Sequence, residues 1–156
     1  NFDIKKVIYL IKYSPRSALE NQTIFVSRGK GEEALRIADK DISPSSIKTI
    51  FDLSNDGALG FDPPLYTHMN YLIARYSGGD NGDLLIYDLN NNKLITSSVY
   101  DINPGLNWMI GYDKPLNETT IQISLFRIDN STGTAQINLT TGKLIPGSIH
   151  ETGKAQ

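Results

Sequence analysis

The chain of 156 residues contains no cysteine, which excludes disulfide bonds, thiolate nucleophiles and cysteine-ligated zinc or iron sites at once. Histidine is almost as scarce, because His68 and His150 are the only two, and a histidine-rich transition-metal site is not expected. The longest apolar run covers residues 7–11 and is interrupted by Tyr9, whereas a transmembrane helix needs about 20 apolar residues. We therefore expect no cofactor, no metal and no transmembrane segment.

The sequence also lacks an excess of either charge. Lysine and arginine number 15 against 17 aspartates and glutamates, giving a formal net charge of -2. Because nucleic-acid affinity rests on clustered lysine and arginine, no nucleic-acid partner is expected. The hydrophobic share of 39% and the charged share of 21% are typical of globular proteins. We predict a single module over residues 1–156.

What the sequence does contain is an internal repeat. Residues 60–65 (GFDPPL) recur 51 positions later as residues 111–116 (GYDKPL), and residues 70–95 align without gaps on residues 120–145. A fainter first copy places residues 13–15 where residues 61–63 lie in the second. Repeats of this length indicate stacked units that each bury a face against a neighbour. The predicted repeats are 8–52, 53–101 and 102–148, and residues 149–156 form a C-terminal tail.

Each copy predicts short strands separated by turns. Residues 23–28, 71–76 and 121–128 are rich in β-branched and aromatic side chains, which favour strands. The Asn81-Gly82 step favours a type I′ hairpin, and residues 90–92 and 140–142 favour further turns. The composition of residues 31–40 is compatible with a helix, but their alignment with the strand at residues 84–88 predicts a strand. The predicted fold class is all-β, with tandem four-stranded antiparallel repeats.

The second copy carries a specific pattern: Phe61-Asp62-Pro63-Pro64, then residues 71–74 (YLIA), then residues 83–89 (DLLIYDL) and Asn92-Lys93. In these residues it resembles a blade of the TolB-type β-propellers, relatives of the WD-repeat group. The Asp-Gly step usual in that family after Ser-Pro is absent from all three copies. The resemblance implies propeller-like blades.

A propeller closes with about four to eight blades, and this chain has room for three. The chain is therefore expected to be a fragment of a longer protein, to pair as a homo-oligomer that closes its sheet edges, or to adopt another fold. A β-trefoil is the structural alternative, because its three four-stranded repeats close on their own.

The acidic residues suggest no active or metal site. Asp62 and Asp113 occupy equivalent positions in successive copies, too far apart for the close carboxylate pair of a glycosidase, so we predict that they cap turns. Asp80, Asp83 and Asp88 offer oxygen ligands of the type calcium prefers, but the EF-hand spacing is absent. A plain hairpin is the expected role of this segment.

Three residues are predicted to bind a partner: His68, Trp108 and Tyr66. His68 falls in a Tyr66-Thr67-His68 segment predicted to be a loop, and a general-base role there would need a nucleophile and an orienting group. No Gly-x-Ser-x-Gly elbow is present, so we predict no catalytic residue. Trp108, the only tryptophan, suits either core packing or an interface hot spot.

The sequence ranks functional classes rather than naming a function. We expect a non-enzymatic protein- or glycan-binding or scaffold module located outside the cytoplasm, in the periplasm, at the cell surface or secreted. The alternative is a fragment or subunit of a larger propeller-containing enzyme whose active site lies outside this chain. Four Asn-x-Ser/Thr sequons, at Asn21, Asn117, Asn130 and Asn138, are explained by glycosylation or by turn chemistry.

Overall fold

The computed structural model describes residues 7–10, 21–28, 33–53, 60–78, 81–96, 109–127 and 129–154. These residues form three antiparallel sheets, which we name A, B and C in chain order. Sheet A contains β1 (Val7–Leu10), β2 (Gln22–Arg28), β3 (Glu33–Asp39) and β4 (Lys48–Asp52), with the 3₁₀ helix η2 (Pro44–Ser46) before β4. Sheet B contains β5 (Gly60–His68), β6 (Tyr71–Gly78), β7 (Asn81–Asp88) and β8 (Lys93–Thr96). Sheet C contains β9 (Met109–Asn117), β10 (Thr120–Phe126), β11 (Ser131–Asn138), β12 (Lys143–Leu144) and β13 (His150–Lys154).

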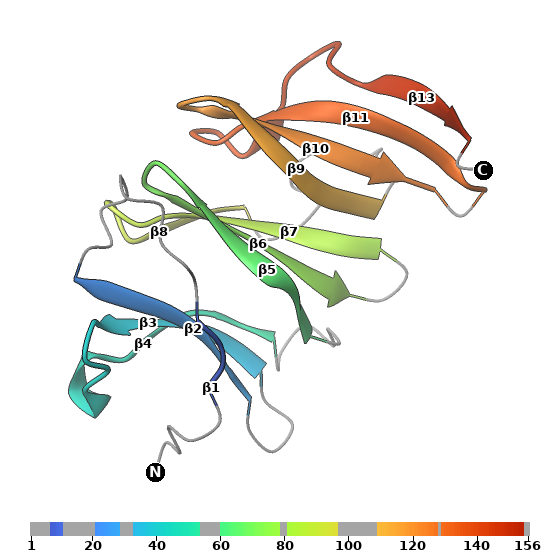
Figure 1. Ribbon diagram of the computed structural model, residues 1–156. Coiled ribbons are helices and arrows are strands. Elements are labelled where there is room, and N and C mark those ends of the chain that lie inside the picture. Colours follow the sequence, from blue (N-terminus) through green and yellow to red (C-terminus); the bar gives the residue numbers. More distant parts are fainter. Residues whose placement is uncertain are drawn as a thin grey trace.

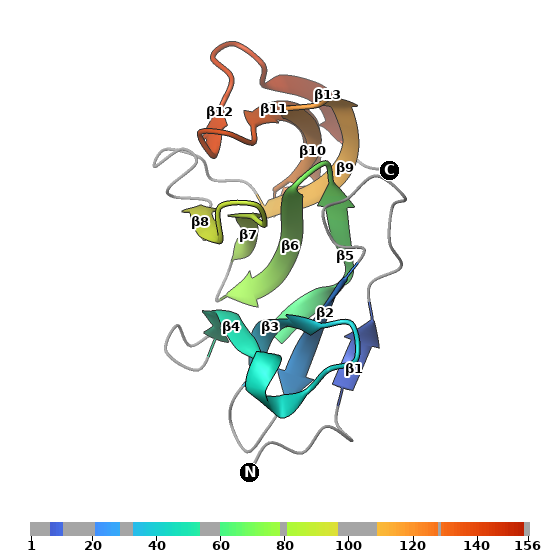
Figure 2. The same ribbon diagram turned by 90° about the vertical axis from the view of Figure 1, so that its left-hand side faces the viewer.

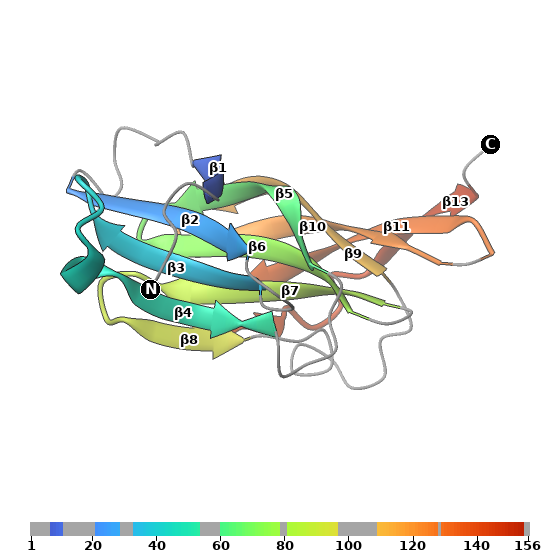
Figure 3. The same cartoon turned by 90° about the horizontal axis from the view of Figure 1, so that it is seen from below.

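The three sheets are stacked in chain order, with sheet B in the middle (Figure 1). Figure 2 shows that β1, β5 and β9 lie along one side of the stack and β4, β8 and β12 along the opposite side. Seen from below, the strands of sheets A and B run in similar directions and overlap (Figure 3). The first four strands of each sheet form a meander of consecutive strands, as the repeat predicts.

This arrangement confirms the predicted all-β fold of four-stranded antiparallel repeats and decides between its alternatives. The β-trefoil alternative is wrong, because each repeat forms its own sheet and is not one third of a common barrel. The strand prediction for the segment around β3 is confirmed over the helix: Glu33–Asp39 pairs along its length with β2.

Two hydrophobic clusters fill the two spaces between the sheets. Because successive side chains of a strand point to opposite faces of its sheet, the central sheet contributes side chains to both clusters. The cluster between sheets A and B consists of Ile24, Val26, Leu35, Ile37, Leu53, Phe61, Leu72, Ala74, Tyr76, Leu85, Tyr87 and Leu89. The cluster between sheets B and C consists of Tyr71, Ile73, Leu84, Ile86, Ile110, Ile121, Ile123, Leu125, Ala135, Ile137 and Leu139. Sheet B is therefore apolar on both faces.

The gapless alignment of the second and third copies is wrong by one residue in their second strands. Tyr71 pairs with Asp88 at the end of the β6–β7 ladder, and Thr120 pairs with Asn138 at the corresponding place in sheet C. Tyr71 therefore corresponds to Thr120 and not to Ile121. Two residues (79–80) separate Gly78 and Asn81, the last pair of the β6–β7 ladder, whereas three (128–130) separate Arg127 and Ser131, whose backbone hydrogen bond closes the β10–β11 hairpin; the extra residue therefore lies in the hairpin.

Two predicted turns prove to be strand. Asn81 and Gly82 lie in β7, opposite Gly78 and Ser77, so the hairpin closes two residues earlier than the Asn-Gly step suggested. Pro63, which follows Asp62, and Pro115, which follows Lys114, lie within β5 and β9, beside register shifts in their pairing with β6 and β10. Proline has no amide donor and is tolerated at bulges of edge strands, which is what β5 and β9 are.

The turns at Asn92 and Gly142 are confirmed, and both residues have positive φ, 49° and 68°. Gly142 is buried, and a Cβ there would lie 2.9 Å from Cγ2 of Ile95 and 3.2 Å from Cβ of Thr96. The β11–β12 turn of sheet C is thus packed directly on β8 of sheet B. Glycine satisfies both the backbone conformation and this close approach.

The segment expected to be a C-terminal tail contains β13, which pairs with β11 beyond the short β12. Together β12 and β13 cover the outer edge of β11. Gly133 of β11 leaves room for this strand, because a Cβ there would lie 2.8 Å from the backbone oxygen of His150.

Candidate binding surface between sheets B and C

The candidate surface lies where the β5–β6 and β9–β10 turns emerge from the stack. Figure 1 shows these turns at the left side, together with the β7–β8 and β11–β12 turns. They carry the polar residues Asn70, Asn90, Asn91, Thr119 and Thr140. Loops held by a rigid scaffold are the usual positions of binding residues.

Tyr66 of β5 and Tyr112 of β9 form a ring pair across the junction of the two sheets. Their ring centroids are 4.1 Å apart and the ring planes are inclined by 36°. Both are partly buried and pack against the cluster between sheets B and C. Such aromatic pairs contribute about 0.5–1.5 kcal/mol beyond their buried area. The pair fixes the edge of sheet B to the edge of sheet C.

His68 lies two residues beyond Tyr66 on the same face of β5 and joins the same neighbouring sheet. Its Nε2 is 2.7 Å from the backbone oxygen of Asn117, the last residue of β9. A carbonyl oxygen accepts, so the imidazole donates from Nε2. The residue is half-buried, and with the proton on Nε2 the Nδ1 atom is a hydrogen-bond acceptor.

The tyrosine pair lies in a partly desolvated environment. Burial raises the pKa of Tyr112 above its ordinary value, and Tyr66 and Asp113 raise it further. The carboxylate of Asp113 accepts a hydrogen bond from Nε2 of Gln122, 2.6 Å away, so it is held toward β10. Tyr112 therefore presents a neutral hydroxyl over the physiological pH range.

Asp88, at the end of β7, organises the adjacent turns. Its Oδ1 accepts hydrogen bonds from Asn70 Nδ2 at 2.8 Å and from the backbone amides of Asn90 and Asn91 at 3.0 and 3.2 Å. Its Oδ2 accepts from Asn91 Nδ2 at 2.7 Å. Burial of the carboxylate raises its pKa, but these hydrogen bonds outweigh burial and the net pKa is lowered.

The aspartates considered as calcium ligands do not come together. Asp83 pairs with Tyr76 and Asp88 with Tyr71, five residues apart along the same ladder, which is roughly 17 Å for an extended strand. Asp80 lies outside the described residues. Within the part of the chain that the structure describes, no group of three acidic or histidine side chains could hold a metal ion.

The sequons take different environments. Asn21, Asn117 and Asn130 are exposed, whereas Asn138 is half-buried. The carboxamide oxygen of Asn117 accepts from the Thr119 amide at 3.0 Å, and that of Asn138 accepts from the Thr141 amide at 3.1 Å. Turn chemistry is therefore realised at Asn117 and Asn138. Asn138 occupies the position of Asp88 in its repeat.

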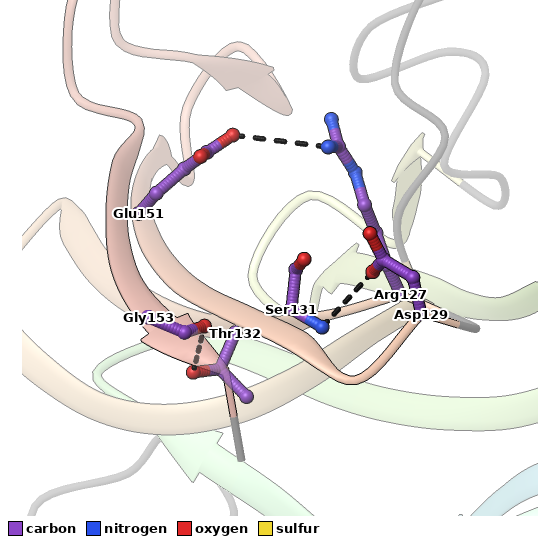
Figure 4. Close-up of polar contacts among 6 residues, drawn as sticks. All are labelled: Arg127, Asp129, Ser131, Thr132, Glu151 and Gly153. Carbon is purple, nitrogen blue, oxygen red and sulfur yellow. Dashed lines mark hydrogen bonds and ion pairs between the residues drawn. The ribbon is translucent and has the colours of Figure 1, made fainter.

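The opposite end of sheet C is held by polar contacts of a structural kind (Figure 4). Arg127 and Glu151 form an exposed ion pair at 3.8 Å, and the Thr132 hydroxyl donates to the Gly153 oxygen at 3.1 Å. Asp129 accepts from the amide of Ser131 at 2.9 Å and closes the β10–β11 hairpin. These contacts fasten β13 and the hairpin, and an exposed pair of this kind contributes little to stability.

Two of the three predicted binding residues are thus brought together and the third lies outside the described residues. Tyr66 and His68 are strand residues of β5, so their assignment to a loop is wrong. Trp108 is not among the residues described. Tyr112 and Asn117 were missed as site residues, although Tyr112 lies at the position of Phe61 in the recurring GFDPPL motif. That motif was the available signal.

Comparisons with known proteins identify the architecture. No protein-family model matches the chain, and no curated protein matches it. The solved structure of TolB from Acinetobacter baumannii is similar over 87% of this chain, with a TM-score of 0.51 and 13% sequence identity. The described chain is a propeller-like stack of three blades.

A solved puromycin hydrolase mutant in complex with PGG is aligned over 87% of the propeller-like stack at 8% identity, with a TM-score of 0.33. This value is too low to support an argument, so the fold assignment depends on TolB. The stack spans 30% of the TolB chain and 28% of the hydrolase chain. At 13% identity the likeness to TolB shows the fold alone. It confirms the resemblance to TolB-type blades seen in the sequence. The described residues contain no helix with the length and apolarity needed to span a membrane.

Proposed function

We propose that the stack is a non-enzymatic binding module that recognises a protein or a glycan through the surface formed by Tyr66, His68, Tyr112 and Asn117. The observation that carries this proposal is the ring pair of Tyr66 and Tyr112, 4.1 Å apart, beside a half-buried imidazole at the junction of two blades. Aromatic side chains with a polar group at one end suit an interface, because they bury area and still form directed hydrogen bonds.

The surrounding turns support a polar ligand. The turns of sheets B and C at this end of the strands carry the amides and hydroxyls of Asn70, Asn90, Asn91, Thr119 and Thr140. A partner with hydroxyl or amide groups would meet matching donors and acceptors there. We place the module outside the cytoplasm, in the periplasm, at the cell surface or in secretion. The exposed sequons at Asn21 and Asn117 are compatible with that location.

The experiment is a binding screen with the chain as probe. In one arm, the fluorescently labelled chain is applied to a glycan array. In the other, the chain is immobilised and incubated with extracts of the secreted and cell-envelope fractions of its source. His68→Ala and Trp108→Ala are compared with Thr152→Ala, which changes an exposed strand residue at the far end of sheet C. We expect the His68→Ala variant to lose binding to the ligands that the unaltered chain retains, and the Thr152→Ala variant to keep that binding. Binding unchanged in both site variants would remove these residues from the site.

A second candidate is favoured by the share of TolB that the stack covers. Because it spans 30% of that chain, we propose as the alternative a fragment or subunit of a larger propeller-containing enzyme whose active groups lie elsewhere. The intact mass of the protein purified from its source decides between the two. A mass far above 17.3 kDa would favour the larger enzyme.

A further inference from the structure

The three blades can be compared position by position through their backbone pairing. The ladders of their second and third strands end in equivalent pairs: Gln22 with Asp39, Tyr71 with Asp88, and Thr120 with Asn138. Counting residues along the second and third strands from these pairs gives each position its equivalent in the other two blades. We call the face of each sheet that points toward the next sheet in the chain its forward face.

The forward faces of sheets A and B are apolar at their centres. In sheet A the forward positions are Ile24, Val26, Leu35 and Ile37, all in the cluster shared with sheet B. In sheet B the equivalent positions are Ile73, Arg75, Leu84 and Ile86, and three of the four are completely buried against sheet C. A forward face of this kind requires a following sheet to cover it.

The forward face of sheet C is polar at the same four positions. They are occupied by Gln122, Ser124, Thr134 and Gln136, all partly exposed. Their neighbours on β10 and β11 face sheet B and are fully buried, so the alternation is strict. Apart from β13 and the connection that leads to it, which belong to sheet C, Figure 1 shows no described element on the side of sheet C that points away from sheet B. The repeat thus changes character in its third copy, on one face and not on the other.

We propose that the forward face of sheet C is the solvent-facing end of the stack, on which neither a further blade nor a second copy of the chain packs. Covering this face would remove the Gln136 carboxamide, the Ser124 and Thr134 hydroxyls and the Gln122–Asp113 hydrogen-bonded pair from water, and burying polar groups without new partners is strongly unfavourable. Terminal repeats of stacked arrays carry polar outer faces for the same reason.

The inference bears on assembly and is independent of the proposed binding function. Two copies that closed a ring would need blade-to-blade contact on this face of each copy, so the proposal predicts that the chain does not form such a ring. Tyr66 and His68 lie in the last three residues of β5, next to the β5–β6 turn and away from the forward face of sheet C, so they stay accessible whether or not that face is covered.

Because the chain has no cysteine, a single introduced cysteine reports directly on exposure. Thr134→Cys and Leu84→Cys occupy equivalent positions on the forward faces of sheets C and B. Each variant is first shown by circular dichroism to be folded and is then treated with a charged maleimide. We expect the thiol of folded Thr134→Cys to react at nearly the rate measured for the same variant unfolded in urea. Leu84→Cys should be strongly protected. Protection of Thr134→Cys in the folded protein would overturn the proposal.

A second measurement does not depend on a core variant. Thr134→Lys places a charge on the forward face of sheet C, and its mass by light scattering and its thermal midpoint should equal those of the unaltered chain. Loss of a larger assembly in this variant would show that another copy covers the face. In the converse variant, Gln122→Ile, Thr134→Leu and Gln136→Ile together restore the residue types of sheet B. We expect that variant to associate as concentration rises, and a triple variant with unchanged mass would count against the proposal.

Discussion

His68 on β5 donates a hydrogen bond from Nε2 to the backbone oxygen of Asn117 on β9, 2.7 Å away and 49 residues further along the chain. This bond joins sheets B and C on the side of the molecule where the β5–β6 and β9–β10 turns lie. It is the polar counterpart of the Tyr66–Tyr112 ring pair, which joins the same two edge strands. The candidate binding surface therefore also holds blades B and C together.

Replacing His68 with alanine should consequently weaken the fold as well as any ligand binding. Loss of one hydrogen bond at a partly exposed position costs about 1 kcal/mol of unfolding free energy. Urea denaturation followed by tyrosine fluorescence measures this loss. His150→Ala, on the exposed start of β13, is the control and should change stability by less than about 0.5 kcal/mol. Equal losses in both variants would show that the contact contributes nothing.

Gly142→Ala should be clearly destabilising, and Gly147→Ala provides its control. Both glycines have positive φ, 68° and 73°, so both variants incur the conformational cost of about 1–2 kcal/mol. At Gly142 the added methyl group would also lie 2.9 Å from Ile95 Cγ2, whereas nothing lies within 4 Å at Gly147. The difference between the two melting temperatures isolates the contact between the β11–β12 turn and β8. Identical melting temperatures would contradict this close packing.

The sequence predicted the sheets because their determinants are local. Turn residues such as Asn92 and Gly142, and the β-branched strands between them, define each meander without reference to the other blades. The one-residue error in aligning β6 with β10 has a physical cause. Residues 71–74 are buried on both faces of the central sheet, so the polar alternation that would reveal a slip is absent there.

The candidate site was less predictable because its contacts cross between blades. Tyr66 and His68 were predicted as binding residues within a loop segment, but Tyr112 and Asn117 become their neighbours only through sheet stacking. Nothing in a single sequence specifies which edge residues of two sheets meet. The prolines in β5 and β9 were misread for a related reason, since an edge strand with a bulge and a turn use the same residues.

The stability of the stack should fall at alkaline pH, and Tyr112 should contribute to that fall. Its pKa is raised by burial, so the folded state keeps its hydroxyl protonated at pH values where the unfolded chain has begun to lose the proton. The contribution is complete below the ordinary tyrosine pKa of about 10 and is lost as pH rises toward the folded value. Chemical denaturation at pH 8 and pH 10.5 should show a smaller decline for Tyr112→Phe than for the unaltered chain. Tyr87, whose pKa is also raised, will maintain part of the decline.

Asp88 should produce the opposite dependence at acid pH. Its net pKa is lowered because four hydrogen bonds to its carboxylate outweigh the effect of burial. A lowered pKa gives stability that is present above the unfolded value of 3.8 and is lost as pH falls through the folded value. Asp88→Ala should cost about 2 kcal/mol or more at pH 7, because it also leaves the Asn90 and Asn91 amides without their acceptor. Asp113→Ala, which removes an exposed carboxylate with one hydrogen bond, is the matched control. If the stability difference between Asp88→Ala and the unaltered chain is the same at pH 7 and pH 3, the carboxylate does not hold these turns in its ionised form.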